Sequence, residues 1–165
     1  MEYKELKDQA CHYVDELKPV IYGIADALHD HPETGMNEVF ASTTLKKILQ
    51  DHGFAIDNPV ADAFPTAFHA VCGNGPFQMG FLAEYDALPE IGHGCGHNLI
   101  AAMSVGAALA FAKAAGTKAT VHVYGCPAEE TVGSKVYMSE HGVFDGLEAA
   151  VIVHPGTDQT YIGGT

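Results

Sequence analysis

A cysteine and a histidine separated by one glycine, Cys95-Gly96-His97, lie in the stretch EYDALPEIGHGCGHNL at positions 84–99. Gly96 permits unusual backbone angles, so the thiol and the imidazole can turn toward a common point. We expect a helix to begin directly after them, with Asn98 as its N-cap, and the positive end of that helix favours a thiolate. The motif is equally compatible with a buried cysteine beside a capping turn. Its function therefore depends on partners elsewhere in the chain.

Two adjacent carboxylates, Glu129 and Glu130, follow the apolar run at 119–125. Neighbouring carboxylates repel each other, which disfavours their placement for packing alone. One can bind a metal while the other, close to it but not bound, takes a proton from a water molecule at the metal. The alternative is that both belong to the first turn of a helix at 131–141, where acidic side chains suit the helix dipole.

The order of the predicted elements brings these groups to one edge of a sheet. Apolar runs predict strands and helices in alternation at 77–83, 99–116, 119–125, 131–141 and 149–154. Glu84 and Asp86 follow the first strand. Glu129 and Glu130 follow the second, and His154 closes the third. Ligands gather at the carboxyl ends of strands in open α/β sheets, so the three strand ends together predict a metal site. Alone, His154 is more typical of a hydrogen-bonded histidine at a strand end.

The alternation of strands and helices predicts an α/β fold, a three-layer α/β/α sandwich with a mostly parallel central sheet. The runs at 119–125 and 149–154 are almost wholly apolar, as expected of strands with both faces covered. Before the sheet, helical periodicity predicts helices at 4–30, with a break or kink at Pro19, and at 37–52. The segments 66–71 and 77–83 around an Asn-Gly turn predict a β-hairpin.

Composition excludes several classes of partner. The chain has 21 acidic against 8 basic residues and a formal net charge of -13, which argues against nucleic-acid or anionic-membrane surfaces. We expect no transmembrane segment and no signal peptide. The 4 cysteines are too scattered for a disulfide framework, so we expect a cytoplasmic location.

Four motifs then carry a family resemblance over almost the whole chain: HDHPETGMNE, AEYDALPEIGHGCGHNL, GCPAEE and VIVHPG. In this order they resemble the aminoacylase and carboxypeptidase family of co-catalytic metallopeptidases. They are most similar to its amidohydrolase branch, which includes aminobenzoyl-glutamate hydrolases and indole-acetyl-amino-acid hydrolases. The resemblance implies a zinc-peptidase-like catalytic domain. It also implies hydrolysis of the amide bond of an N-acyl amino acid, an aminobenzoyl-glutamate-like conjugate or a dipeptide.

The resemblance also implies roles for the strand-end residues. Cys95 would bridge two metal ions in place of an aspartate used elsewhere in the family. His97 and Glu130 would each bind one metal or share the pair, and His154 would be a further ligand. Glu129 would be the general base.

Two acidic residues before the Cys-Gly-His motif remain. Asp86 would orient a ligand, as the family's strand-end aspartate does. Glu84 stands where much of the wider family carries a metal-binding histidine, and its role stays open.

The implied cofactors are two divalent metal ions. Thiolate, imidazole and carboxylate ligands suit zinc, with manganese, cobalt or nickel as alternatives. Two such ions ~3.5–4 Å apart activate a shared water and polarise the amide carbonyl. The implied partner is a small-molecule amide substrate.

This chain is much shorter than typical members of the family that it resembles. We expect residues 1–165 to correspond to the N-terminal portion of a catalytic domain that is incomplete at its C-terminus. The dimerisation or lid domain and the C-terminal catalytic segment, with one more metal-binding histidine, are expected to lie outside it. The full-length parent would be a homodimer.

Two other readings remain open. The 165-residue chain alone could be an inactive fragment that binds metal or self-associates through an unfinished sheet edge. A nucleophilic or redox enzyme using Cys95 with His93 or His97 is a third reading, and it leaves the two glutamates and His154 without a role.

Overall fold

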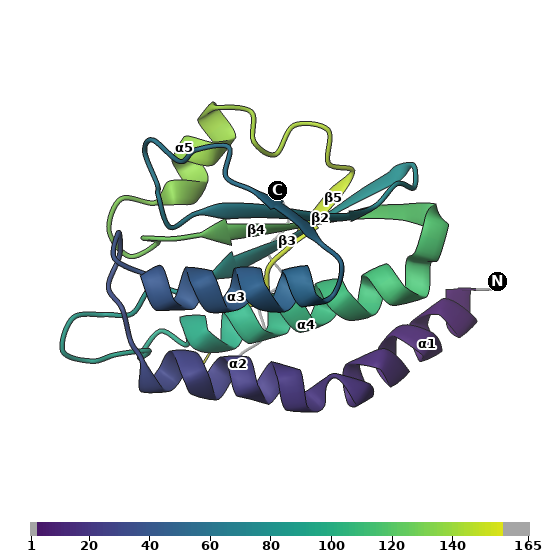
Figure 1. Cartoon of the computed structure of the whole chain (residues 1–165), viewed down its shortest axis with the longest axis horizontal. Helices are drawn as coiled ribbons and strands as arrows, with labels where there is room; N and C mark the ends of the chain where they lie inside the picture. Colours follow the sequence, from purple (N-terminus) through teal and green to yellow (C-terminus); the bar gives the residue numbers. More distant parts are fainter. Residues whose placement is uncertain (1–2, 157–165) are drawn as a thin grey trace.

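The computed structural model describes residues 3–156, and a mixed five-stranded sheet in the order β1-β2-β4-β3-β5 forms the centre of this part (Figure 1). The strands are β1 (Ala55–Asp57), β2 (Phe68–Gly73), β3 (Phe77–Glu84), β4 (Ala119–Cys126) and β5 (Ala149–Val151). β3 pairs in parallel with β4 and β5, whereas β2 pairs antiparallel with β4 and β1. The parallel pair β3–β4, connected through a helix, is the part that carries the candidate site.

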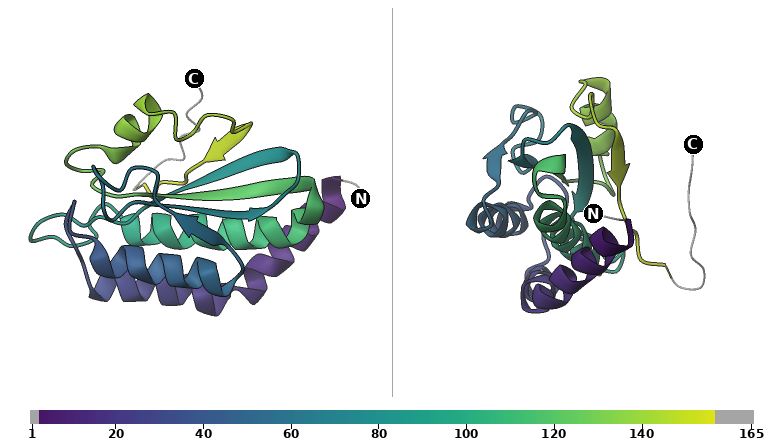
Figure 2. Two further views of the ribbon diagram at one scale, coloured as in Figure 1. Left: turned by 45° about the horizontal axis from the view of Figure 1, so that its top comes forward. Right: turned by 90° about the vertical axis from the view of Figure 1, so that its right-hand side faces the viewer.

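Helices cover the two faces of the sheet unequally. One face packs against α3 (Val39–Asp51) and α4 (His97–Ala115), and α1 (Tyr3–Glu16) and α2 (Lys18–Asp30) pack on the outer side of α4. A 3₁₀ turn, Gly116–Lys118, leads from α4 into β4, and α5 (Ser134–Glu140) lies over the opposite face (Figure 2). These layers confirm the expected α/β fold class. The predicted break in the first helix is also confirmed, because α1 ends before Leu17 and Pro19 occupies the first turn of α2.

The central helix α4 is apolar on nearly every side. By length and composition the segment His97–Lys118 could cross a membrane, a test that the core helix of a folded domain also passes. In the structure it packs against α1, α2 and the sheet, and Ile100, Val105 and Ala108 are fully buried. An all-round apolar helix is what the core between a sheet and a second helical layer requires. The burial indicates a core helix.

The predicted hairpin of β2 and β3 was wrong, because β4 lies between these two strands. A Cβ atom at Gly75 would stand 2.2 Å from the backbone nitrogen of Ala119, where β4 begins. Gly73 has a φ of +88° and approaches the Ala119 carbonyl in the same way. These glycines therefore let a third strand enter between the two segments, whereas in the sequence they resemble the turn of a hairpin.

Burial of the two apolar strands also differs from expectation. β4 is buried along almost all of its length, as predicted for a central strand. β5 is only three residues long and pairs on one side with β3, and Val151 is 37% exposed. The expected coverage of both faces of this strand was wrong within the described residues. His154 consequently lies three positions beyond the end of β5.

Candidate metal centre

His97 occupies the middle of the candidate site. It is the first residue of α4, after Gly96 in the left-handed region with φ of +81°, and its side chain is fully buried. Its Nδ1 lies 2.8 Å from Oδ1 of Asp86, which is also buried. Because the carboxylate accepts the Nδ1 proton, the ring is fixed with Nε2 facing the strand ends.

Three glutamates surround His97 Nε2. Oε2 of Glu84 lies 3.3 Å away, Oε1 of Glu130 3.6 Å, and Oε2 of Glu129 4.0 Å. Among the described residues, neither His97 Nε2 nor Glu84 Oε2 has a hydrogen-bond partner, although both atoms are buried. Buried polar atoms without partners are rare and costly in folded proteins. A cation between these two atoms would satisfy both, so the arrangement fits a metal ligand set.

Cys95 completes one group of potential ligands. One ligand atom each from Cys95, His97 and Glu130 lies within 4.8 Å of the others. The pKa of the Cys95 thiol is raised to about 11. A hydrogen bond to Glu130 is the largest cause and burial the second. The thiol is therefore protonated at neutral pH in the absence of a cation. Binding of a cation would have to displace that proton.

His154 belongs to a second group, in which ligand atoms of Glu84, His97 and His154 lie within 4.8 Å of one another. Its ring stands nearly perpendicular to that of His97, with centroids 5.7 Å apart. Pro155 packs against Gly96 so closely that a Cβ there would lie 2.4 Å from the proline ring. The glycine between Cys95 and His97 thus also gives room to the segment that carries His154.

Charge in the site is predominantly negative. Burial lowers the pKa of His97, but its hydrogen bond to Asp86 and the nearby Glu84 and Glu130 outweigh burial and raise the pKa above its usual value. Burial alone would raise the pKa of Asp86. Hydrogen bonds from His97 and from the Glu130 backbone N–H outweigh it, so this pKa is lowered. A cluster with these directions of shift favours positive charge at its centre.

The adjacent glutamates lie in a turn, and α5 begins only at Ser134. The interpretation that both occupy the first turn of a helix was therefore wrong. The backbone N–H of Glu130 donates to Oδ2 of Asp86 at 3.0 Å, so Asp86 holds both His97 and this turn. The predicted N-cap was also wrong: Gly96 occupies that position, and the Asn98 side chain instead donates to the Ala25 carbonyl at 3.1 Å.

Lys135 was missed in the sequence. Its ammonium forms an ion pair with Oε1 of Glu84 and lies 3.9 Å from Oε1 of Glu129. It neutralises one oxygen of Glu84 and leaves Oε2 facing His97. No local pattern marks this lysine, because its partner Glu84 lies 51 positions earlier in the chain. Only the packing of α5 over the ends of β3 and β4 brings the two together.

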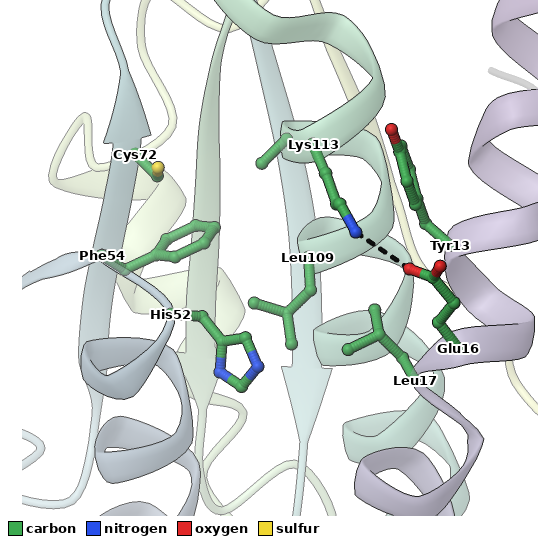
Figure 3. A pocket seen from close by; sticks show the side chains of 9 residues that line it. Tyr13, Glu16, Leu17, His52, Phe54, Cys72, Leu109 and Lys113 are labelled. Carbon is green, nitrogen blue, oxygen red and sulfur yellow. Dashed lines mark hydrogen bonds and ion pairs between the residues drawn. The ribbon is translucent and has the colours of Figure 1, made fainter.

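A separate cavity of about 440 Å³ lies on the helical face of the sheet (Figure 3). The Lys113–Glu16 ion pair crosses one side of it, while Leu17 and Leu109 form an apolar wall. Of the described residues that line it, none belongs to the predicted metal site. The chemistry predicted from the sequence therefore lies at the strand ends and outside this cavity.

Comparison with known proteins identifies hydrolases among the relatives of this chain. No family model matches the chain. Over 152 residues the chain is 38% identical to one of the subunits of p-aminobenzoyl-glutamate hydrolase from Escherichia coli (strain K12), covering 80% of this chain and 31% of that protein. It is 35% identical over 171 residues to Xaa-Arg dipeptidase of Mus musculus, covering 95% of this chain and 40% of the relative.

A solved structure extends the similarity to the fold. A dinuclear metal-binding peptidase of the M20 family from Bacillus subtilis matches with a TM-score of 0.70 at 25% identity, covering 82% of this chain and 42% of that one. The resemblance to co-catalytic metallopeptidases and amidohydrolases is confirmed by these similarities. The chain spans 31% and 40% of the length of the two curated relatives described above.

Proposed function

From this similarity and the cluster around His97, we propose that the whole protein is a metal-dependent amidohydrolase. It would cleave the amide bond of an N-acyl amino acid, an aminobenzoyl-glutamate-like conjugate or a dipeptide. The observation that carries the proposal is the pair His97 Nε2 and Glu84 Oε2, which lie 3.3 Å apart, buried and without hydrogen-bond partners among the described residues. Both are atoms that bind divalent cations, and Cys95 and Glu130 add two more ligands beside them.

The proposed cofactors are two divalent cations held by Cys95, His97, Glu130 and His154. Glu84 is a further ligand, because its Oε2 faces the same point as His97 Nε2. When bound, the ions supply Lewis-acid polarisation of the amide carbonyl and of a water molecule. Sulfur, nitrogen and oxygen ligands together favour zinc, with manganese, cobalt and nickel as the alternatives for metal analysis to distinguish.

Glu129 is proposed as the general base. Its carboxylate borders the cluster, 4.0 Å from His97 Nε2, and is 37% exposed, so a water molecule can reach it. It would take a proton from the attacking water and then deliver that proton to the leaving amine nitrogen. Asp86 holds the His97 ring and the Glu130 backbone, so its contribution is to fix the positions of two ligands.

The substrate, the assembly and the cellular location of the whole protein are also proposed. The relatives' names suggest substrates with a free carboxylate, either an aminobenzoyl-glutamate or a dipeptide ending in arginine. A homodimer in the cytoplasm is proposed as its assembly and location. The net charge of -13 supports a small-molecule substrate over nucleic acid or an anionic membrane.

A decisive experiment compares the wild-type protein with Glu129→Gln and Cys95→Ala. We expect hydrolysis of p-aminobenzoyl-glutamate or of a dipeptide to fall by ~10²–10⁴-fold in Glu129→Gln, with the metal content unchanged. Metal content should fall in Cys95→Ala. The absence of any bound transition metal in the wild-type protein would contradict the proposal.

The 165-residue chain by itself is proposed to bind metal without catalysing hydrolysis. The exposed β5 edge and the partial coverage of the relatives favour this distinction. Hydrolysis by the 165-residue chain that disappears in Glu129→Gln would show that the chain is an active enzyme on its own.

A further inference from the structure

Residues 33–38 belong to the linker between α2 and α3. They contact both the segment that follows β3 and the segment that follows β4. On the β3 side, the backbone N–H of Ala87 donates to the Glu33 carbonyl at 2.8 Å, and Thr34 forms an isolated parallel bridge with Ala87. Ala87 directly follows Asp86, which holds the ring of His97. This segment therefore supports one side of the candidate site from outside.

On the β4 side, the same segment packs against the turn that precedes Glu129. A Cβ at Gly35 would lie 3.0 Å from Cα of Ala128 and 2.7 Å from Oγ1 of Thr131. The backbones approach so closely that only glycine fits at this position. The contact continues at the residue before α3, where Glu38 reaches the same turn.

Glu38 is fully buried, and both of its carboxylate oxygens accept hydrogen bonds. Oε1 accepts from the backbone N–H of Ala128 at 2.7 Å, and Oε2 accepts from the Thr66 hydroxyl at 2.9 Å. No basic side chain is among these partners. A buried carboxylate held by neutral donors carries a desolvation cost, so its retention calls for a specific role.

Ala128 explains why the turn needs external support. Its φ is +55°, a left-handed conformation that is unfavourable for a non-glycine residue and persists only where the surroundings enforce it. Glu38 binds the N–H of Ala128, and Asp86 binds the N–H of Glu130. Glu129 lies between these two anchored peptide groups. Its backbone is therefore held on both sides by buried carboxylates.

We propose that Glu38 is a positioning residue that fixes the Ala128–Glu130 turn, and through it the general base Glu129 and the ligand Glu130. The proposal rests on the proposed function for the roles of those two glutamates. Glu38 itself touches neither candidate ligand atoms nor the base. Its effect passes through the backbone of Ala128, in the way that partners outside a metal site orient the ligands within it.

The experiment compares four versions of the 165-residue chain: wild type, Glu38→Ala, Glu38→Gln and Glu33→Ala. Glu33 is the matched control. Its carboxylate accepts hydrogen bonds from the backbone N–H groups of Phe40 and Ala41 at the start of α3, and none from the Ala128–Glu130 turn. Two properties are measured: amide hydrogen exchange at Ala128 in the metal-free chain, and zinc affinity by competition with a chelator.

Loss of the Glu38 carboxylate should speed exchange at Ala128 by ~5–10-fold, since one hydrogen bond is removed. Zinc affinity should fall by ~10–100-fold, the usual effect of removing a partner that orients a ligand. Glu38→Gln keeps an acceptor for the Ala128 N–H and should restore most of both properties. Glu33→Ala should leave both within about twofold, because its carboxylate accepts from Phe40 and Ala41 and not from the Ala128–Glu130 turn.

Unchanged Ala128 exchange in Glu38→Ala, or equal changes in Glu33→Ala, would overturn the proposal. If the wild-type chain binds no zinc, the proposed function fails, whereas exchange at Ala128 still decides whether Glu38 holds the turn. If Glu38→Ala does not fold, Glu38→Asp replaces it. The aspartate keeps the charge but is one methylene too short to reach Ala128, and the same losses are expected.

Discussion

The Asp86 carboxylate lies 2.8 Å from Nδ1 of His97, with both side chains fully buried at the end of β3 and the start of α4. Its second oxygen accepts the backbone N–H of Glu130 at 3.0 Å. One carboxylate thus accepts from the first residue of α4 and from the turn that follows β4. An amide of the same shape cannot accept from both.

Asp86→Asn should therefore weaken metal binding. The asparagine must turn its NH₂ group toward either His97 or Glu130, and a donor then faces a donor. We expect zinc affinity to fall by ~10–100-fold, measured by chelator competition. Asp57→Asn is the control, because Asp57 pairs with His69 on an exposed part of the sheet away from the site, and it should leave the affinity unchanged. Equal affinity in the two variants would contradict the prediction.

Lys135→Met should destabilise the protein through Glu84. Without the ammonium, Oε1 of the buried Glu84 loses its partner, which costs about 1–3 kcal/mol in the free energy of unfolding measured with urea. Lys47→Met removes a lysine whose ion pair with Asp51 is exposed, and a loss below about 0.5 kcal/mol is expected there. Adding Glu84→Gln to Lys135→Met should recover part of the stability. A loss no larger than that of Lys47→Met would show that Glu84 does not depend on Lys135.

Gly35→Ala should be destabilising by about 1–3 kcal/mol, because its Cβ would collide with backbone and side-chain atoms of Ala128 and Thr131. Gly23 offers a matched control within α2, where a Cβ meets nothing within 4 Å. Gly23→Ala should stabilise by ~0.5–1 kcal/mol, since alanine favours a helix over glycine. Thermal unfolding of the two variants measures both effects, and similar midpoints would refute the close packing of residues 33–38 on the turn.

A fall in pH should lower the free energy of unfolding through His122, which lies in β4. Its Nε2 lies 2.8 Å from Oε1 of Gln78, and its Nδ1 lies 2.9 Å from Nε2 of His69, which pairs with Asp57. The pKa of His122 is lowered, mainly by burial and secondly by the charge of the nearby His69. The unfolded chain therefore binds this proton more readily than the folded one, so stability should fall as pH drops below about 6.5 toward the folded-state pKa.

The measurement is urea unfolding at several pH values between about 7.5 and 5, on either side of the ordinary histidine pKa, for the wild type and for His122→Gln. The variant should show a weaker loss of stability on acidification. His141→Gln, at a surface histidine bonded to its own helix, should keep the wild-type slope. Parallel slopes for wild type and His122→Gln would exclude His122 as the titrating group.

The strand-end reasoning located the groups that meet at the site, because carboxyl ends of parallel strands share one edge of a sheet whatever the details of packing. Glu129, Glu130 and Asp86 follow β4 and β3 in this way, and the Cys-Gly-His motif enters from the helix between these strands. Local patterns also predicted the break at Pro19 and the apolar helix α4, since both depend on residues close in sequence.

The parts that sequence reasoning missed depend on distant contacts. The hairpin was wrong because Gly73 and Gly75 accommodate Ala119, a residue far along the chain, and not a turn between neighbours. No local pattern predicts the contacts of Lys135 or of Glu38, although Glu38 is the last residue of the motif HDHPETGMNE. Each contact depends on a partner that is distant in sequence.

The bond between Glu38 and Ala128 spans 90 positions, and that between Asp86 and Glu130 spans 44. Contacts of such separation form late and slowly in folding, because the loop entropy must be overcome before they contribute. A chain with only its helices formed lacks the complete site, so we expect a ligand of this site to bind after the sheet has formed. Such a ligand would stabilise the native state by mass action and slow its unfolding.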